Sequence, residues 1–337
     1  MKEKKDVWMR GDQRMSRAVV ALVAVLFPAL FLPACDAQEL SGKLTIAGST
    51  TVLPINQECA NILMERNPDL RITVSGGGSG HGIKAVGAGD IDIGAASRDI
   101  KEEEWKRYPD LNPFVIAKDG VAIIVNTEND VNELTMDEIS KIFAGEIKNW
   151  KEVGGEDAEI RVITREAGSG TRETFEKFVM KPYGREMAVR ASVKPSNGEV
   201  KATVATDRNA IGYISLGHVD ESVKALKIDG VEPTVENVLS GRYPLSRNLY
   251  LITKGEPSPL EKAFIDFVLS TEGREIVEKL GFIPVTTPTP TASPSATQTS
   301  TPTPTPTPTP AATQPGYEAI FFAATVLFAL FLVRRKR

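Results

Sequence analysis

The sequence predicts an α/β protein whose central part folds as two lobes around one ligand site. From Lys43 to Pro284, short apolar runs of β type alternate with longer stretches of helical periodicity. Three of the β-like runs end in glycine and hydroxyl residues directly before a helical pattern. At about 240 residues, this body suits two lobes better than a single core.

The expected elements follow from the apolar pattern in chain order. Strands are expected over 44–47, 71–74, 91–94, 121–126, 160–163, 210–215 and 248–253. Helices are expected over 54–67, 81–88, 135–144, 171–179, 197–205 and 259–280. The last stretch is the longest and carries Phe264, Phe267, Val268 and Ile276 on one side, which predicts a single long amphipathic helix.

Three strand-to-helix loops, 48–51, 75–80 and 164–171, have a composition suited to anion binding. The first turn of a helix has free N–H groups and a positive dipole end. Glycine lets the backbone approach a ligand closely, while Ser and Thr hydroxyls and the planar fork of Arg165 add donors. Because ligands of open α/β sheets bind outside the carboxyl ends of strands, we expect the three loops to surround one small anion.

The same loops lack the features of nucleotide or hydrolase sites. Loop 75–80 has neither the lysine of a Walker loop nor the glycine spacing of a dinucleotide-binding loop. The alternative to an anion-binding role for this loop is a flexible turn. Ser169 lacks the flanking glycines of a nucleophile elbow, because Ala167 and Thr171 stand there. Only two histidines occur in the chain, which leaves few candidates for base or metal chemistry. The sequence therefore predicts no enzyme, no cofactor and no metal site.

Several side chains near the loops have two readings. Arg98 and Arg172 either contact the anion or pair with acids to brace their loops, and we favour bracing. Ser97 can donate to or accept from a ligand. His81, at a helix start, either contacts the ligand or is solvated, and we favour solvation. Cys59 lies on the apolar face of its helix and is expected to pack there.

The amino-terminal region reads as a secretory signal over residues 1–35. A basic start is followed by an apolar run over 18–32, which is short for a membrane span, and then by small residues. Leu32-Pro33-Ala34-Cys35 also resembles a lipoprotein cleavage box, in which Cys35 becomes the lipidated first residue. Plain cleavage near Ala37 is the alternative, and export is expected in either case.

The carboxyl-terminal region reads as a spacer and an anchor. Residues 286–315 are uncharged and rich in Thr and Pro, so we expect an extended stalk that reaches up to ~90 Å, and this composition is typical of O-glycosylated stalks. Residues 316–337 hold an apolar run before a basic tail, which predicts membrane attachment. Pro315-Gly316-Tyr317 resembles the Pro-Gly-Phe sorting signal of archaeal surface proteins, with Tyr317 in place of Phe. We expect a protein anchored to the outer face of the cell membrane.

The charge balance argues against a nucleic-acid partner. The chain has 40 Lys and Arg against 44 Asp and Glu, and both termini are basic, so the body carries the acidic excess. A nucleic-acid surface needs a basic patch. A small anion does not, because a buried site depends on local dipoles and on one or two arginines.

Nearly all of 43–284 resembles the PstS family, the substrate-binding proteins of phosphate ABC transporters. The stretch 47–54 is similar to the amino-terminal anion loop of that family, and 75–80 and 165–172 resemble its second and third loops. Further matching stretches are 142–145, 149–150, 153–155, 210–213 and 281–284.

The resemblance implies a two-lobe type II periplasmic-binding-protein fold with a hinge and an interlobe ligand cleft. Lobe 1 would comprise 43–121 plus 247–285, and lobe 2 would comprise 122–246. The phosphate contacts that it implies fall on Thr50, Thr51, Ser79, Arg165, Ser169, Gly170 and Thr171, and Ser97 completes the predicted ligand-binding set. Arg165 would supply charge, and the hydroxyl and N–H groups would surround the ligand oxygens.

Two positions depart from the pattern of the family. Ser97 stands where well-known members carry an aspartate, which accepts the proton of hydrogen phosphate and repels sulfate. Ala167 replaces an acid that pairs with the binding arginine in some members. We therefore expect weaker discrimination against sulfate, and an Arg165 that exerts more of its charge on the ligand.

The resulting expectation is an extracellular protein that captures inorganic phosphate between two lobes and delivers it to ABC permease subunits. Alternatives are a binding protein for another tetrahedral oxyanion (sulfate, molybdate or tungstate) and a phosphate-responsive surface protein without transport. A phosphatase is the most distant alternative.

Overall fold

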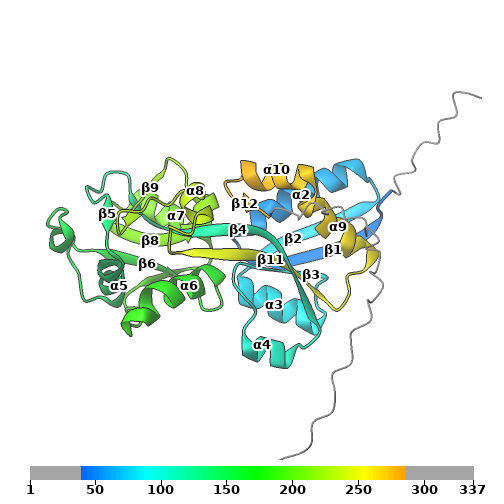
Figure 1. Cartoon of the computed structure of the whole chain (residues 1–337), viewed down its shortest axis with the longest axis horizontal. Helices are drawn as coiled ribbons and strands as arrows, with labels where there is room; N and C mark the ends of the chain where they lie inside the picture. The colour runs from blue at the N-terminus through cyan, green and yellow to red at the C-terminus, as the bar shows by residue number, and fades with distance from the viewer. Residues whose placement is uncertain (1–38, 286–337) are drawn as a thin grey trace, which may run out of the picture. The chain divides into compact units, whose positions relative to one another are not determined.

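The computed structural model describes residues 39–285, which form a mixed α/β body on one large sheet (Figure 1). The strand order is β2-β1-β3-β11-β4-β8-β6-β7, and β12 and β9 also pair with β4; β10 and β5 form a separate two-stranded sheet. The strands are β1 (Gly42–Gly48), β2 (Leu70–Gly77), β3 (Ile93–Ala96), β4 (Leu111–Asn126), β5 (Glu133–Leu134), β6 (Arg161–Arg165), β7 (Ser192–Lys194), β8 (Ala210–Ser215), β9 (Val223–Ala225), β10 (Lys227–Ile228), β11 (Ser246–Lys254) and β12 (Ile283–Pro284).

The helices lie between these strands and cover the sheet. The α-helices are α2 (Leu53–Arg66), α3 (Ser79–Ala88), α4 (Glu102–Arg107), α5 (Met136–Ala144), α6 (Gly170–Phe175), α7 (Asn197–Thr206), α8 (Val235–Leu239), α9 (Pro259–Leu269) and α10 (Thr271–Lys279). Short 3-10 turns are η2 (Trp150–Val153), η4 (Lys181–Tyr183) and η5 (Leu216–His218), and the π-helix η3 (Glu176–Met180) continues α6. The predicted signal peptide with Cys35, the stalk and the terminal anchor lie outside the described residues.

The first half of the sheet is built from parallel strands. β1 pairs in parallel with both β2 and β3, and α2 and α3 connect these strands in turn. In Figure 1, α2, α9 and α10 lie on one side of these strands, and α3 and α4 lie on the other. Leu44 and Ile46 of β1 and Phe264 of α9 belong to one hydrophobic core, which buries the inner faces of these elements.

The second half has a core of its own. β8 pairs in parallel with β6 and is buried along its whole length, as is common for strands of parallel pairs. Phe175 of α6 stacks on Tyr213 of β8 with ring centroids 4.2 Å apart. Phe143 of α5 packs against both rings. These aromatic residues form the centre of the second core.

Two long antiparallel strands, β4 and β11, pass between the two cores. They pair from Ser246 opposite Gly120 to Lys254 opposite Leu111. Ile116 of β4 lies in the first core, whereas Val121 lies in the second. The two cores therefore share these strands, and the described residues belong to a single contact unit.

Every predicted strand is present, and so is every predicted helix except the last, with several shifted ends. The predicted strand 121–126 is the second part of the 16-residue β4, because Pro113, Lys118 and Gly120 interrupt the apolar pattern of its first part. The single long helix predicted over 259–280 is wrong. It is two helices, α9 and α10, because Ser270 adopts an extended backbone and its hydroxyl accepts from the Gly273 N–H, capping α10.

Cys59 of α2 is fully buried in the first core, as predicted from its apolar face. Burial raises the pKa of its thiol to about 12, with Glu58 and Glu272 acting in the same direction. The side chain is therefore a packing group and not a reactive thiolate at neutral pH.

Candidate functional site

The three predicted loops meet at the carboxyl ends of β1, β2 and β6. The Thr51 and Thr171 hydroxyl oxygens lie 3.2 Å apart, although they belong to the first and third loops. The Gly80 N–H of the second loop donates to the Gly168 carbonyl of the third at 2.9 Å. Gly168 has a φ of +86°, a conformation that glycine adopts without strain. Helices α2, α3 and α6 all start at this junction, so their free N–H groups converge there.

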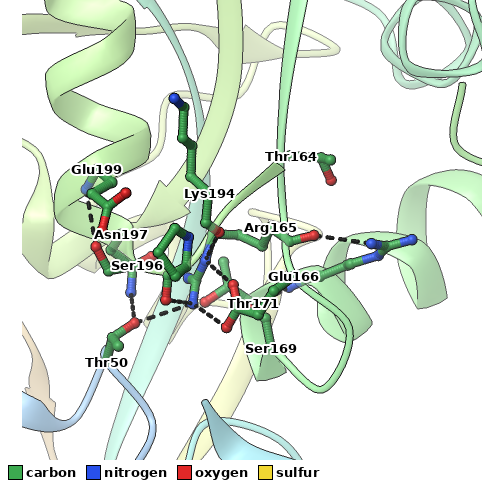
Figure 2. Close-up of polar contacts among 12 residues, drawn as sticks. Thr50, Thr164, Arg165, Glu166, Ser169, Thr171, Lys194, Ser196, Asn197 and Glu199 are labelled. Atoms are coloured by element: carbon green, nitrogen blue, oxygen red, sulfur yellow. Dashed lines mark hydrogen bonds and ion pairs between the residues drawn. The ribbon is translucent and has the colours of Figure 1, made fainter. Parts of the chain in front are cut away.

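Arg165 is the cation of this junction. It ends β6, is 1 % exposed, and its Nη2 donates to Thr50 Oγ1 at 3.2 Å (Figure 2). Its Nε and Nη2 also donate to the carbonyl groups of Lys194 and Pro195, at 3.2 and 3.3 Å. Nη1 is buried and has no hydrogen-bond partner among residues 39–285. This nitrogen is a donor available to a ligand.

Glu166 corrects one expectation from the sequence. Its carboxylate accepts from Arg165 Nε and Nη2 at 2.9 Å each, as Figure 2 shows. The sequence predicts that Arg165 exerts more of its charge on the ligand because Ala167 replaces an acid, and this prediction is wrong. The neighbouring residue supplies the carboxylate instead.

Tyr213, on the neighbouring strand β8, holds the carboxyl end of β6. Its hydroxyl lies 2.7 Å from Thr164 Oγ1 and accepts from the Arg165 N–H at 3.3 Å. Burial raises the pKa of this phenol to about 12, although both hydrogen bonds act against that shift. The neutral phenol therefore holds the backbone of Arg165 in place.

Ser79, Ser97 and Gly170 form a second, closely packed part of the junction. The Ser97 N–H donates to Ser79 Oγ at 3.0 Å, and the two hydroxyl oxygens lie 3.3 Å apart. A Cβ at position 170 would lie 2.4 Å from Ser79 Oγ and 2.5 Å from Ser97 Oγ. Only glycine leaves room for these hydroxyl groups beside the first turn of α6. Ser169, also buried, caps α6 by accepting from the Arg172 N–H at 3.3 Å.

The structure thus brings together all eight predicted ligand-binding residues, and they are buried. It also adds residues that the sequence reasoning missed. Asn197, at the start of α7, donates to Thr50 and Thr51, and Arg247 of β11 donates to Thr51 and Thr171. Asn197 follows Ser196, whose hydroxyl caps α7 shortly after β7, and a cap of this kind is a signal that the sequence carried. Arg247 has no comparable signal.

Two predicted braces are confirmed. Arg98 donates to the Glu104 carboxylate with two hydrogen bonds of 2.7 Å, and its Nε lies 3.0 Å from Glu173 Oε2. Burial alone would lower the pKa of Arg98, but these two carboxylates raise it. Arg172 donates to Glu176 and to the Arg165 carbonyl.

The two histidines differ in environment. His81 is exposed, as expected. His218, in η5, packs its ring against Phe282 at 6.3 Å. Burial lowers the pKa of His218, and the positive charges of Lys201 and Arg247 lower it further. Asp119 and a hydrogen bond with the Thr51 backbone act in the opposite direction but do not outweigh burial.

We expect the protein to lose stability in mild acid because of His218. Its folded-state pKa lies below the ordinary value of about 6.5, so in the window beneath that value the unfolded chain binds more protons. The free energy of unfolding should therefore decrease as the pH falls below about 6.5. Urea unfolding at pH 7.5 and 5.5 measures this, and His218→Gln should reduce the difference. If the stability difference between the two pH values is unchanged in His218→Gln, His218 is not the group responsible. His81→Gln is the control, because His81 is exposed.

Within residues 39–285, no group of acidic, cysteine and histidine side chains is arranged to hold a metal ion. In the same part of the chain, no helix combines the length and apolar character that a membrane crossing requires.

The fold and the junction of donors define a binding protein of the periplasmic type, and residues 36–272 match the PBP superfamily domain. The chain belongs to the PstS family within this superfamily. It is 39 % identical to the phosphate-binding protein PstS of Bacillus subtilis over 251 residues, which cover 74 % of the chain and 83 % of that protein. It is 32 % identical to PstS of Borreliella burgdorferi over 282 residues, covering 80 % and 100 %.

Solved structures agree with this assignment. A crystal structure described as a phosphate ABC transporter substrate-binding protein with bound phosphate, from Clostridium perfringens, is 42 % identical. It superposes with a TM-score of 0.69 and covers 73 % of this chain and 100 % of its own. An ABC-type phosphate transport receptor from Vibrio cholerae is 36 % identical, with a TM-score of 0.59 and coverage of 71 % and 99 %. These structures confirm the predicted periplasmic-binding-protein fold.

Proposed function

We propose that this protein binds inorganic phosphate between two lobes and delivers it to the permease of an ABC transporter. The observation that carries the proposal is Arg165 Nη1, a buried guanidinium nitrogen without a protein partner among the described residues, at a junction of hydroxyl groups and helix N-termini. A tetrahedral oxyanion supplies the acceptors that such donors need. The relatives in B. subtilis and C. perfringens, named for phosphate binding and phosphate transport, support the same ligand.

The lobes of this proposal are 43–121 plus 247–285, and 122–246. Their support is that the two largest hydrophobic clusters of the described residues are joined by β4 and β11. Thr51 follows β1 in the first lobe, and Thr171 belongs to α6 in the second, so a ligand that contacts both would favour the closed form. Release to a permease then requires reopening.

Calorimetric titration of the purified protein with phosphate, sulfate, arsenate and molybdate tests the proposal. We expect a binding isotherm with phosphate. If only another oxyanion binds, the proposed site is correct and the proposed ligand is wrong. If none of the four anions binds, the proposed site is refuted. A phosphatase assay should show no turnover.

The second candidate ligand is another tetrahedral oxyanion, and Ser97 favours it. Both its hydroxyl and that of Ser79 are neutral, so this part of the junction has no carboxylate to repel a fully ionised anion.

We expect Ser97→Asp to lower sulfate affinity at least about tenfold relative to phosphate affinity, because the new carboxylate repels sulfate and can accept the proton of hydrogen phosphate. Competition titrations of phosphate against sulfate measure this ratio. Ser97→Asn is the matched control, since it has nearly the same size without the charge. If the unaltered protein ignores a large excess of sulfate, the weakened selectivity is refuted.

We also propose that the protein is exported and held at the outer face of the cell membrane, in the manner of archaeal surface proteins. The support is the sequence of 1–35 with Cys35, the 286–315 stalk and the 316–337 segment. Mass spectrometry of both mature termini tests this proposal. An unprocessed amino terminus would refute export by this signal, and a lipid on Cys35 would identify the anchor.

A further inference from the structure

A network of buried polar side chains lies directly behind the predicted ligand-binding residues. Its members are Asp119 of β4, Arg247 of β11, Asn197 of α7 and Ser215 of β8. All four are at least nine-tenths buried, and none belongs to the predicted set of ligand contacts. The network draws on both strands that pass between the two cores.

Asp119 fixes the orientation of Arg247. Its Oδ2 accepts from Arg247 Nε at 2.9 Å and from Nη2 at 2.7 Å. Its Oδ1 accepts from the Ser215 hydroxyl at 2.9 Å. Both carboxylate oxygens are thus engaged, and the guanidinium plane cannot rotate without breaking two short bonds.

Arg247 in turn donates to one hydroxyl from each proposed lobe. Its Nη1 lies 3.1 Å from Thr171 Oγ1, and its Nη2 lies 3.1 Å from Thr51 Oγ1. A lysine could not reach both oxygens in one plane, because its donors sit on a single nitrogen.

Asn197 completes the set of donors. Its Oδ1 accepts from the Ser215 N–H at 3.1 Å, which determines the orientation of the amide. Its Nδ2 therefore faces Thr51 Oγ1 at 3.0 Å and Thr50 Oγ1 at 3.3 Å.

These contacts decide where the hydroxyl protons point. An arginine or an amide nitrogen can only donate, so the threonine oxygens are the acceptors in every one of these bonds. Both acceptor positions of Thr51 are taken, by Asn197 and Arg247, so Thr51 can only donate, either to Thr171 Oγ1 at 3.2 Å or to a ligand. Thr171 accepts from Arg247 and keeps its own proton, because Thr51 has no acceptor position left for it. The pair therefore offers at least the Thr171 proton to an acceptor oxygen in the site.

We propose that Arg247, held by Asp119, is a positioning residue that orients the paired Thr51 and Thr171 hydroxyl groups so that the pair donates to an unprotonated oxygen of the bound oxyanion. The inference rests on the proposed function, because it concerns the same site. Asp119 neutralises the charge of Arg247, so the contribution of Arg247 is orientation and not attraction. Arg165 remains the cation that faces the ligand.

A mutant cycle with phosphate titrations tests the proposal. The four proteins are the unaltered chain, Arg247→Lys, the double variant Thr51→Val with Thr171→Val, and the combination of all three changes. Arg247→Lys alone should weaken phosphate binding about tenfold, which corresponds to losing one or two directed hydrogen bonds. In the valine background the same change should alter the Kd less than about twofold, because no hydroxyl remains to be oriented.

A purely structural role predicts a different pattern. Arg247→Lys would then weaken binding by the same factor in both backgrounds, and this outcome overturns the proposal. Replacing Thr51 and Thr171 with serine keeps both hydroxyl groups, so the effect of Arg247→Lys should persist there. Thermal unfolding of every variant checks the fold. If Arg247→Lys does not fold, the pair Arg247→Gln with Asp119→Asn removes both charges together and is carried through the same cycle.

A failure of the proposed phosphate function can be distinguished from a failure of the proposed role of Arg247. If the unaltered chain binds sulfate or molybdate and not phosphate, the cycle is run with that anion, and the coupling of Arg247 to the two threonines is still measured. If none of the oxyanions binds, both the site and the role of Arg247 are overturned.

Discussion

Replacing Arg165 with alanine should abolish phosphate binding at ordinary ligand concentrations. Nη1 is a buried guanidinium donor without a hydrogen-bond partner among residues 39–285, and the substitution removes it together with the positive charge. Truncating one partner of a buried, hydrogen-bonded charge pair costs about 2–5 kcal/mol, which corresponds to a Kd about 30-fold to several thousand-fold higher.

Glu166 should enlarge the loss. Its carboxylate accepts two hydrogen bonds from Arg165, and in Arg165→Ala it would face the ligand without a compensating cation. Adding Glu166→Gln to Arg165→Ala should therefore recover part of the affinity, since the amide does not repel an anion.

Calorimetric titration with phosphate measures both effects. The matched control is Arg161→Ala, at the opposite end of the same strand β6, where the side chain is exposed and pairs with Asp207. We expect its Kd to be unchanged. An Arg165→Ala protein that folds and binds phosphate within threefold of the unaltered chain would show that the ligand does not contact this arginine.

The loops of the site could be predicted because their signals are local. Glycine and hydroxyl residues between a strand and a helix are visible in one stretch of sequence, and the carboxyl ends of strands meet at one edge of a sheet. The convergence of Thr50, Ser79 and Arg165 could therefore be predicted from pattern and resemblance. Ser270 carried a local signal too, a cap within an otherwise helical stretch, which the apolar periodicity concealed.

The partners of those residues could not be predicted, because they depend on packing between distant segments. Arg165 pairs with the adjacent Glu166, and the sequence does not show which neighbouring side chain points back toward the guanidinium. Arg247 belongs to β11, but the sequence predicts this strand only from Asn248 onward. Asp119 belongs to the first part of β4, for which the sequence predicts no strand. Their meeting follows from the register of β4 and β11, where Arg247 stands opposite Asp119.

Removing that carboxylate should have the largest effect on stability. The Asp119 side chain is fully buried and accepts from Arg247 twice and from Ser215 once. Asp119→Ala would leave Arg247 as an uncompensated charge, 4 % exposed at its side chain, between the two cores. Breaking a buried pair in this way costs about 3–5 kcal/mol, although the net contribution of an intact pair is much smaller.

The loss of stability should affect both cores, because of where the Asp119–Arg247 pair lies. β4 and β11 are shared by both cores, so strain at the Asp119–Arg247 contact weakens the element that joins them. Urea unfolding should show a lower midpoint for Asp119→Ala, and Asp119→Asn should lie between it and the unaltered chain, because the amide oxygen can still accept from the guanidinium. Asp266→Ala, which removes an exposed ion pair with Lys262 on α9, is the control and should shift the midpoint little. Equal midpoints for Asp119→Ala and Asp266→Ala would mean that water reaches Arg247, and that the two strands do not depend on this ion pair.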